Sequence, residues 1–182
     1  MERIKLHDKC FKVSIPYSKI EESIKTVAEQ LNRDYKDVEN PLFLSVLNGS
    51  FMFTADLMKS VNFNCEISFI KLSSYSGVES TGEIKQIIGI NKPLKGRSVV
   101  IIEDIVDTGA TIEELYGLLE KEGVKDIRIC TLLLKPDAYK KDIDINYVAL
   151  RIPNDFIVGF GLDYNELGRQ YKDIYVLDNS GS

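Results

Sequence analysis

The sequence contains no tryptophan, one histidine, few cysteines and no long apolar run. Its three cysteines, Cys10, Cys65 and Cys130, are odd in number and far apart, which is typical of reduced thiols rather than a disulfide framework. One histidine and no C-x-x-C motif argue against a zinc site. No segment reaches the ~18 consecutive apolar residues of a membrane span, and residues 1–8 show no signal-peptide core. We therefore expect a cytoplasmic protein with no membrane partner.

Basic runs are also missing. The 182 residues include 23 Lys and Arg against 28 Asp and Glu, a net charge of −5. Because this balance repels DNA and RNA, we expect no nucleic-acid partner, although a small anion could still bind at one local site. With 44% hydrophobic and 28% charged residues, the composition is that of a globular chain. The length suits a single domain over residues 1–182.

Short apolar segments alternate with amphipathic ones. Apolar runs predict buried strands at residues 42–47, 65–72, 98–102, 127–134 and 147–152. Helical spacing of apolar residues predicts helices after residue 18, over residues 51–60, and from residue 112 to Gly123. Ser18 and Glu21 match a capping box at the first helix. The alternation favours an α/β fold with a mainly parallel sheet and helices on both faces.

Residues 73–86 interrupt this alternation. The segment is polar, contains Gly77 and Gly82, and has little periodicity. A loop of this length and composition is typical of a lid that closes over a site. A loop with no role in function is the alternative.

Acidic residues follow the apolar run at residues 98–102. Glu103, Asp104 and Asp107 lie within five positions, at a strand end where α/β sheets bind ligands. Residues 107–111, Asp-Thr-Gly-Ala-Thr, open a helix whose N–H groups and hydroxyls can hold a phosphate. Glu103 and Asp104 would repel a phosphate and instead suit sugar hydroxyls or Mg²⁺. The segment therefore predicts a site for a phosphorylated ribose with magnesium.

Two other interpretations of this segment stay open. Asp107 and Thr108 could be helix caps only, with Glu103 and Asp104 as solvated charges. Residues 107–110, Asp-Thr-Gly-Ala, also match aspartic proteases, in which two carboxylates share a proton. The helical pattern that follows and the single Asp-Thr-Gly copy argue against a protease, since a carboxylate pair would then require a dimer.

Residues 99–111 resemble the phosphoribosyl-pyrophosphate signature of type I phosphoribosyltransferases. Other segments extend the resemblance to the hypoxanthine-guanine branch of that family: residues 47–57 resemble its pyrophosphate loop, residues 74–82 its catalytic loop, residues 134–135 its purine-contacting lysine, and residues 156–166 its base-binding segment. The resemblance implies a mainly parallel twisted sheet flanked by helices. A small hood of terminal segments would include a base-binding part near residues 153–171.

The reaction that this resemblance implies is the transfer of a phosphoribosyl group from 5-phosphoribosyl pyrophosphate to hypoxanthine or guanine, giving IMP or GMP. Residues implied at the phosphoribosyl group are Glu103, Asp104, Asp107, Thr108, Gly109, Ala110 and Thr111. Asp107 would be the catalytic base that takes the purine N7 proton. Residues implied at pyrophosphate are Asn48, Gly49, Ser74, Tyr75 and Arg169. Residues implied at the purine are Lys135, Phe156, Ile157 and Asp163.

Magnesium and self-association are also implied by the resemblance. Mg²⁺ would bind through Glu103 and Asp104 at the ribose, and a second Mg²⁺ would bind through Asp163 at the pyrophosphate. The chain would form a homodimer or homotetramer. Asn48 stands where many relatives carry a lysine; main-chain N–H groups, exposed by a cis peptide at Leu47–Asn48, could make that side chain dispensable. A regulatory module that senses phosphoribosyl pyrophosphate without catalysis is the alternative function, and the acidic net charge argues against it.

Ordinary structural roles stay open for several of these residues. Lys135 could extend its amino group from a strand end into water, and Phe156 could be a core aromatic. Asp163 and Arg169 could form a surface ion pair, worth ~0–1 kcal/mol.

Overall fold

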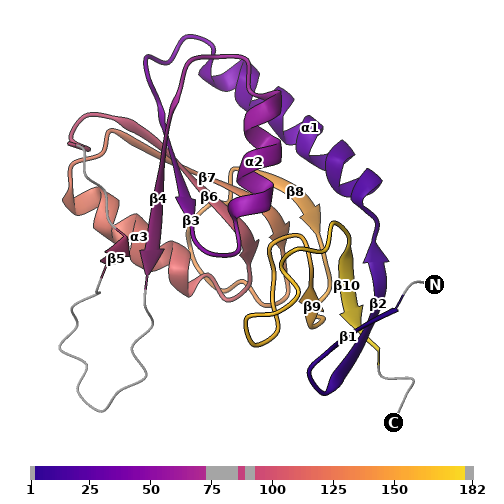
Figure 1. Ribbon diagram of the computed structural model, residues 1–182. Helices are drawn as coiled ribbons and strands as arrows, with labels where there is room; N and C mark the ends of the chain where they lie inside the picture. The colour runs from indigo at the N-terminus through magenta and orange to yellow at the C-terminus, as the bar shows by residue number, and fades with distance from the viewer. Residues whose placement is uncertain (1–2, 73–85, 89–92, 179–182) are drawn as a thin grey trace, which may run out of the picture.

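The computed structural model describes residues 3–72, 86–88 and 93–178, and its centre is a twisted six-stranded sheet (Figure 1). In spatial order the strands are β5 (Gln86–Ile88), β4 (Glu66–Leu72), β3 (Leu42–Val46), β6 (Ser98–Val106), β7 (Asp126–Leu134) and β8 (Tyr147–Arg151). Five strands run parallel, and β5 pairs antiparallel with β4. The prediction of a mainly parallel α/β sheet is confirmed, although Gln86, expected to close the loop, begins β5.

Helices cover both faces of this sheet, as predicted. They are α1 (Tyr17–Tyr35), α2 (Phe51–Ser60) and α3 (Ala110–Lys121). Successive side chains of a strand point to opposite faces: Val100 and Ile102 of β6 join the core cluster under α1 and α2, whereas Val99 and Ile101 join the cluster under α3 (Figure 1). Covering on both faces explains why the apolar run of β6 is continuous.

The start of α1 differs from the prediction. The helix begins at Tyr17 with Pro16 as N-cap and no side-chain cap bond, so the capping box of Ser18 and Glu21 is wrong. Instead, the Tyr17 amide donates a 2.6 Å hydrogen bond to Asp173 Oδ1. A carboxylate that is remote in sequence thus satisfies one of the free N–H groups of the first turn.

A second, four-stranded antiparallel sheet joins the two ends of the chain. Its order is β1 (Arg3–Leu6), β2 (Lys9–Ile15), β10 (Ile174–Leu177) and β9 (Ile157–Val158). The buried carboxylate of Asp178 lies 3.0 Å from Arg3 Nη2 and 3.5 Å from Lys12 Nζ. This small sheet is the hood that the family resemblance implies (Figure 1).

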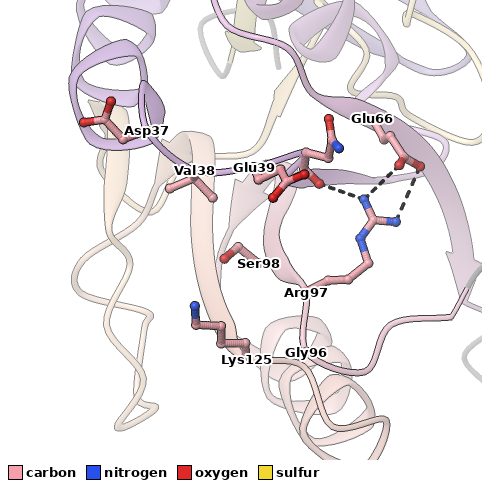
Figure 2. Close-up of a pocket in the computed structure, with 9 residues that line it drawn as sticks. Asp37, Val38, Glu39, Glu66, Gly96, Arg97, Ser98 and Lys125 are labelled. Atoms are coloured by element: carbon pink, nitrogen blue, oxygen red, sulfur yellow. Dashed lines mark hydrogen bonds and ion pairs between the residues drawn. The ribbon is translucent and has the colours of Figure 1, made fainter.

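A cavity of about 700 Å³ lies at the amino-terminal ends of the parallel strands (Figure 2). Arg97 crosses it: Nη2 donates to the Asn40 carbonyl at 2.8 Å and lies 3.2 Å from Glu66 Oε1. Ligands of α/β sheets bind at the opposite edge, so Arg97 has a structural role here, holding the starts of β4 and β6 together. Across the described ranges, no helix has the length and apolar character that crossing a membrane requires.

Candidate active site

The strand β6 carries the two acids farther into the sheet than expected. The apolar run predicted a strand over residues 98–102, but pairing with β7 continues through Glu103, which lies opposite Thr131. Both acids are therefore strand residues and both are buried. As neighbours on a strand they project to opposite sides, so they meet different surroundings.

Asp104 lies against the loop that follows β3. Its Oδ1 accepts a 3.0 Å hydrogen bond from the Ile105 amide. A Cβ atom added to Gly49 would stand 1.7 Å from Asp104 Oδ2, so no residue other than glycine fits here unless the carboxylate moves. Burial raises the pKa of Asp104 from 3.8 to about 6, although the Ile105 amide and the Arg169 guanidinium act in the opposite direction.

This raised pKa predicts a pH-dependent cost to folding. The carboxyl titrates near 3.8 in the unfolded chain and near 6 in the folded protein. The folded state therefore binds the proton more tightly than the unfolded chain does. The stabilisation that this binding gives at low pH is lost as the pH rises from about 4 through 6, and above that range the buried charge lowers stability. We expect Asp104→Asn to raise the free energy of unfolding by about 3 kcal/mol at pH 7 and by less than about 1 kcal/mol at pH 4. Urea unfolding without magnesium or substrate measures both values.

The matched control for that experiment is Asp126→Asn. Asp126 is partly exposed and lies 3.2 Å from Arg128 Nε, so its replacement should change stability by no more than about 1 kcal/mol at either pH. An Asp104→Asn effect of equal size at pH 4 and pH 7 would contradict the assignment of a buried, titrating carboxyl.

Glu103 faces a separate cavity of about 220 Å³, which is lined by Val46, Leu47, Leu72, Glu103, Thr111 and Glu114. Its Oε2 is buried and makes no hydrogen bond with the described residues. Burial, and to a smaller extent the Asp104 carboxylate, raises the pKa of Glu103 well above its usual 4.5. A buried oxygen of this kind calls for a partner that the described residues do not supply, and a sugar hydroxyl or a hard cation is such a partner.

The loops after β6 and β7 are joined by an ion pair. Lys135 Nζ lies 2.8 Å from Asp107 Oδ2, and the Lys135 amide donates to the Val106 carbonyl at 3.0 Å. Only 8% of Lys135 is exposed, so the interpretation of a lysine extending into water is wrong. The sequence placed Lys135 at the end of a strand but gave no sign of this partner.

Residues 107–111 form the turn into α3. The N-cap is Gly109, at φ 84° and without a side-chain cap bond, so neither Asp107 nor Thr108 is the N-cap residue. Thr108 Oγ1 is 3.5 Å from the Ala110 amide. A Cβ on Gly109 would stand 2.5 Å from the Tyr139 ring. The turn thus holds small residues at the positive end of a helix, an arrangement that suits an anion.

The hood segment closes onto the same edge of the sheet. Gly161 has φ 97°, and a Cβ there would stand 2.0 Å from the Gly49 carbonyl oxygen. Arg169 donates through Nη1 to the Gly161 carbonyl at 2.9 Å, and its Nη2 lies 2.8 Å from Asp163 Oδ1. Arg169 and Asp163 are mostly covered, so theirs is not a simple surface pair. Gly49 therefore lies between Asp104 and the hood.

The other predicted residues lie as follows. The Leu47–Asn48 peptide is cis. Phe156 is 45% exposed, so its interpretation as an ordinary core aromatic is wrong. Ile157 belongs to β9 and is half-buried. Ser74 and Tyr75 lie outside the described residues.

A magnesium ion fits the donors at this edge. Among the residues that the structure describes, no three His, Cys, Asp or Glu side chains cluster as metal ligands. Mg²⁺ usually keeps several waters and binds one or two carboxylates together with substrate phosphates. The unpartnered oxygen of Glu103 and the oxygens of Asp104 and Asp163 are donors of that type.

Comparison with known proteins identifies the family. The family model described as a phosphoribosyl transferase domain matches residues 16–165. A hypoxanthine-guanine phosphoribosyltransferase of Streptococcus pyogenes serotype M3 is 42% identical over 154 residues, which cover 84% of this chain and 85% of that one. The chain belongs to the hypoxanthine-guanine phosphoribosyltransferase family. The predicted family and fold class are confirmed.

Solved structures of this phosphoribosyltransferase family have the same fold. A hypoxanthine phosphoribosyltransferase from Staphylococcus aureus superposes with a TM-score of 0.85 at 38% identity, covering 92% of this chain and 91% of that one. The Trypanosoma cruzi hypoxanthine phosphoribosyl transferase gives a TM-score of 0.85 at 34% identity, covering 96% and 95% of the two chains. The aspartic-protease interpretation of residues 107–110 is therefore wrong.

Sequence reasoning did not foresee how closely the segments of this phosphoribosyltransferase approach one another. Gly49 was predicted as a pyrophosphate-binding residue and Gly161 only fell within a matching segment, yet each admits no side chain because another segment lies against it. A glycine in a loop between predicted elements was the only available signal. The spacing of residues along the sequence does not indicate which segment packs against such a glycine.

Proposed function

We propose that the chain is a purine-salvage enzyme that transfers the phosphoribosyl group of 5-phosphoribosyl pyrophosphate to hypoxanthine and guanine. The observation that carries the proposal is the approach of three segments at one sheet edge, where Gly49 contacts both Asp104 and Gly161. These segments match the pyrophosphate, phosphoribosyl and base-binding parts of the family. Their meeting point suits a donor that spans all three.

The step balances as a substitution at C1 of the ribose. Purine N9 forms a bond to C1 while the bond from C1 to the pyrophosphate oxygen breaks, and the N7 proton passes to Asp107. Positive charge develops on the ribose, beside Glu103 and Asp104. The leaving pyrophosphate carries the negative charge, and the Arg169 guanidinium and the main chain at Asn48 and Gly49 bind it. Residues 107–111 hold the 5′-phosphate at the start of α3.

The Lys135–Asp107 pair suits the edge of a 6-oxopurine. In a 6-oxopurine the acceptor O6 lies next to N7, which carries the proton. The Lys135 amino group and the Asp107 carboxylate are likewise neighbours, 2.8 Å apart. Lys135 donates to O6 while Asp107 accepts from N7. Adenine is rejected because its 6-amino group gives Lys135 no acceptor. Phe156 stacks on the ring, and Ile157 offers main-chain groups to the base.

Magnesium is part of the proposal. Glu103 and Asp104 would hold one ion near the ribose, directly or through its water ligands, and Asp163 would hold a second ion near the pyrophosphate. When bound, Mg²⁺ neutralises charge on the leaving group. The chain's own part is to orient the donor and to keep water from C1.

We also propose a cytoplasmic single-domain protein that forms a homodimer or homotetramer. Three free cysteines are typical of a reducing compartment. Large apolar side chains are exposed on β4 and at the start of α2, at Ile67, Phe69 and Phe51, and contiguous apolar surface commonly marks an interface. The C-terminal region of the Trypanosoma cruzi relative has been studied for its role in oligomeric state.

A direct assay tests the proposed function. Purified protein is incubated with magnesium, 5-phosphoribosyl pyrophosphate and one base at a time: hypoxanthine, guanine, xanthine or adenine. We expect IMP and GMP with release of pyrophosphate, and no AMP. Binding of the donor without any nucleotide product would contradict catalysis and favour the sensing module.

A further inference from the structure

The turn between β1 and β2 reaches the hood segment that bears Tyr164. The Tyr164 hydroxyl donates a 2.8 Å hydrogen bond to Asp8 Oδ1. His7 Nε2 lies 3.1 Å from the Asn165 carbonyl oxygen, and the His7 ring meets the Tyr164 ring edge-on with centroids 5.6 Å apart. Lys9 Nζ lies 5.6 Å from the centroid of the same ring. Consecutive residues 7–9 thus hold one tyrosine.

Tyr164 in turn packs against Phe156. The two ring centroids are 5.6 Å apart at an interplanar angle of 87°. Phe11, fully buried in β2, has its centroid 6.0 Å from Phe156 and 6.2 Å from Tyr164. Edge-to-face pairs of this geometry favour a defined ring orientation. Phe156 nevertheless stays 45% exposed, which leaves area for a further flat ring.

We propose that Tyr164 is a positioning residue for the purine and that the β1–β2 hairpin holds it in place. The inference rests on the proposed function, in which Phe156 stacks on the base. An exposed phenylalanine that rotates freely must lose that freedom when a base binds, whereas a ring already held in one orientation binds at lower entropic cost.

A positioning role differs from a merely structural one in what it changes. Loss of hood stability would lower the melting temperature and weaken the binding of both substrates together. Loss of the Phe156 orientation would weaken purine binding alone. The donor is proposed to lie mainly against β6 and the loop after β3, and Arg169, the hood residue proposed to bind its pyrophosphate, is held by its own contacts with Gly161 and Asp163. The relevant readout is therefore KM for hypoxanthine compared with KM for the donor and with kcat.

Three variants and one control test the proposal. Tyr164→Ala removes the ring, and Tyr164→Phe removes only the hydrogen bond to Asp8. Asp8→Ala removes the same bond together with an exposed 3.7 Å ion pair to Lys9. Tyr147→Phe is the matched control, because it deletes a 2.7 Å tyrosine–aspartate bond to Asp34 between β8 and α1. We expect Tyr164→Ala to raise KM for hypoxanthine about 2- to 12-fold with kcat and KM for the donor within about 2-fold.

The two variants that keep the Tyr164 ring separate a positioning role from a folding defect. Tyr164→Phe and Asp8→Ala should each raise KM for hypoxanthine about 2-fold, and together no more than either alone, since they share one bond. Tyr147→Phe should leave all three constants unchanged. An unchanged hypoxanthine KM in Tyr164→Phe and Tyr164→Ala, or equal changes for both substrates, would overturn the positioning role. A wild-type protein that makes no IMP would instead contradict the proposed function itself.

Discussion

Replacement of Asp107 by asparagine should lower kcat for IMP formation by about 10²- to 10⁴-fold, the usual contribution of a general base. Asparagine keeps the shape of the side chain but cannot accept the N7 proton. It also leaves the amino group of Lys135, 2.8 Å away, without its counter-charge. Affinity for the donor should stay within about 3-fold, because we propose that the N–H groups and hydroxyls of the turn, not the Asp107 carboxylate, bind the 5′-phosphate.

Steady-state kinetics and calorimetric binding of the donor separate these two effects. Asp126→Asn is the matched control, since Asp126 pairs with Arg128 at the start of β7, far along the strand from the site. Its kcat should equal that of the wild type. Undiminished turnover in Asp107→Asn would remove Asp107 from the role of base.

Addition of one methyl group at Gly49 should lower kcat/KM for the donor by about 10²-fold, the usual effect of misplacing a reacting group by about 1 Å. In Gly49→Ala the new Cβ would stand 1.7 Å from Asp104 Oδ2, so the carboxylate or the loop must shift. The loop also touches Gly161 through the Gly49 carbonyl. The shift therefore reaches the hood as well as β6.

Gly117→Ala is the control for that experiment. Gly117 lies within α3, and a Cβ there meets nothing within 4 Å. Alanine in an open helical position should leave the kinetics unchanged and stabilise the protein by about 1 kcal/mol. Wild-type kinetics in Gly49→Ala would show that the contact with Asp104 is not needed for catalysis.

The sequence predicts the main sheet well because its strands are buried on both faces. Such strands appear as continuous apolar runs. The observed starts lie within about a residue or two of the predicted ones for β3, β4, β6, β7 and β8. The exception is the end of β6, where Glu103 and Asp104 were expected beyond the strand. Acidic residues rarely lie inside a buried strand unless they are paired, so composition alone indicated the wrong boundary.

The hood was implied by family resemblance and not by the pattern of its own residues. β1 and β2 mix charged and apolar side chains, and β9 has two residues. β2 pairs with β10, near the other end of the chain. Pairing over such a separation leaves no local periodicity to detect. The same holds for the Asp173 bond that replaces the predicted cap of α1.

The site residues could be named from sequence, but their contacts could not. Asp107, Lys135 and Arg169 each stand in a recognisable segment. The ion pair of Lys135 with Asp107 and the approach of Gly49 to Gly161 join residues that are far apart in the chain. Such contacts follow from the crossing of loops at one edge, which only the folded arrangement determines.

The most direct measurement of the central claim is a crystal structure of the protein with magnesium and 5-phosphoribosyl pyrophosphate. We expect the 5′-phosphate on the turn of residues 107–111, the ribose beside Glu103 and Asp104, and the pyrophosphate between Gly49 and Arg169. A donor bound elsewhere, with that turn empty, would contradict the central claim.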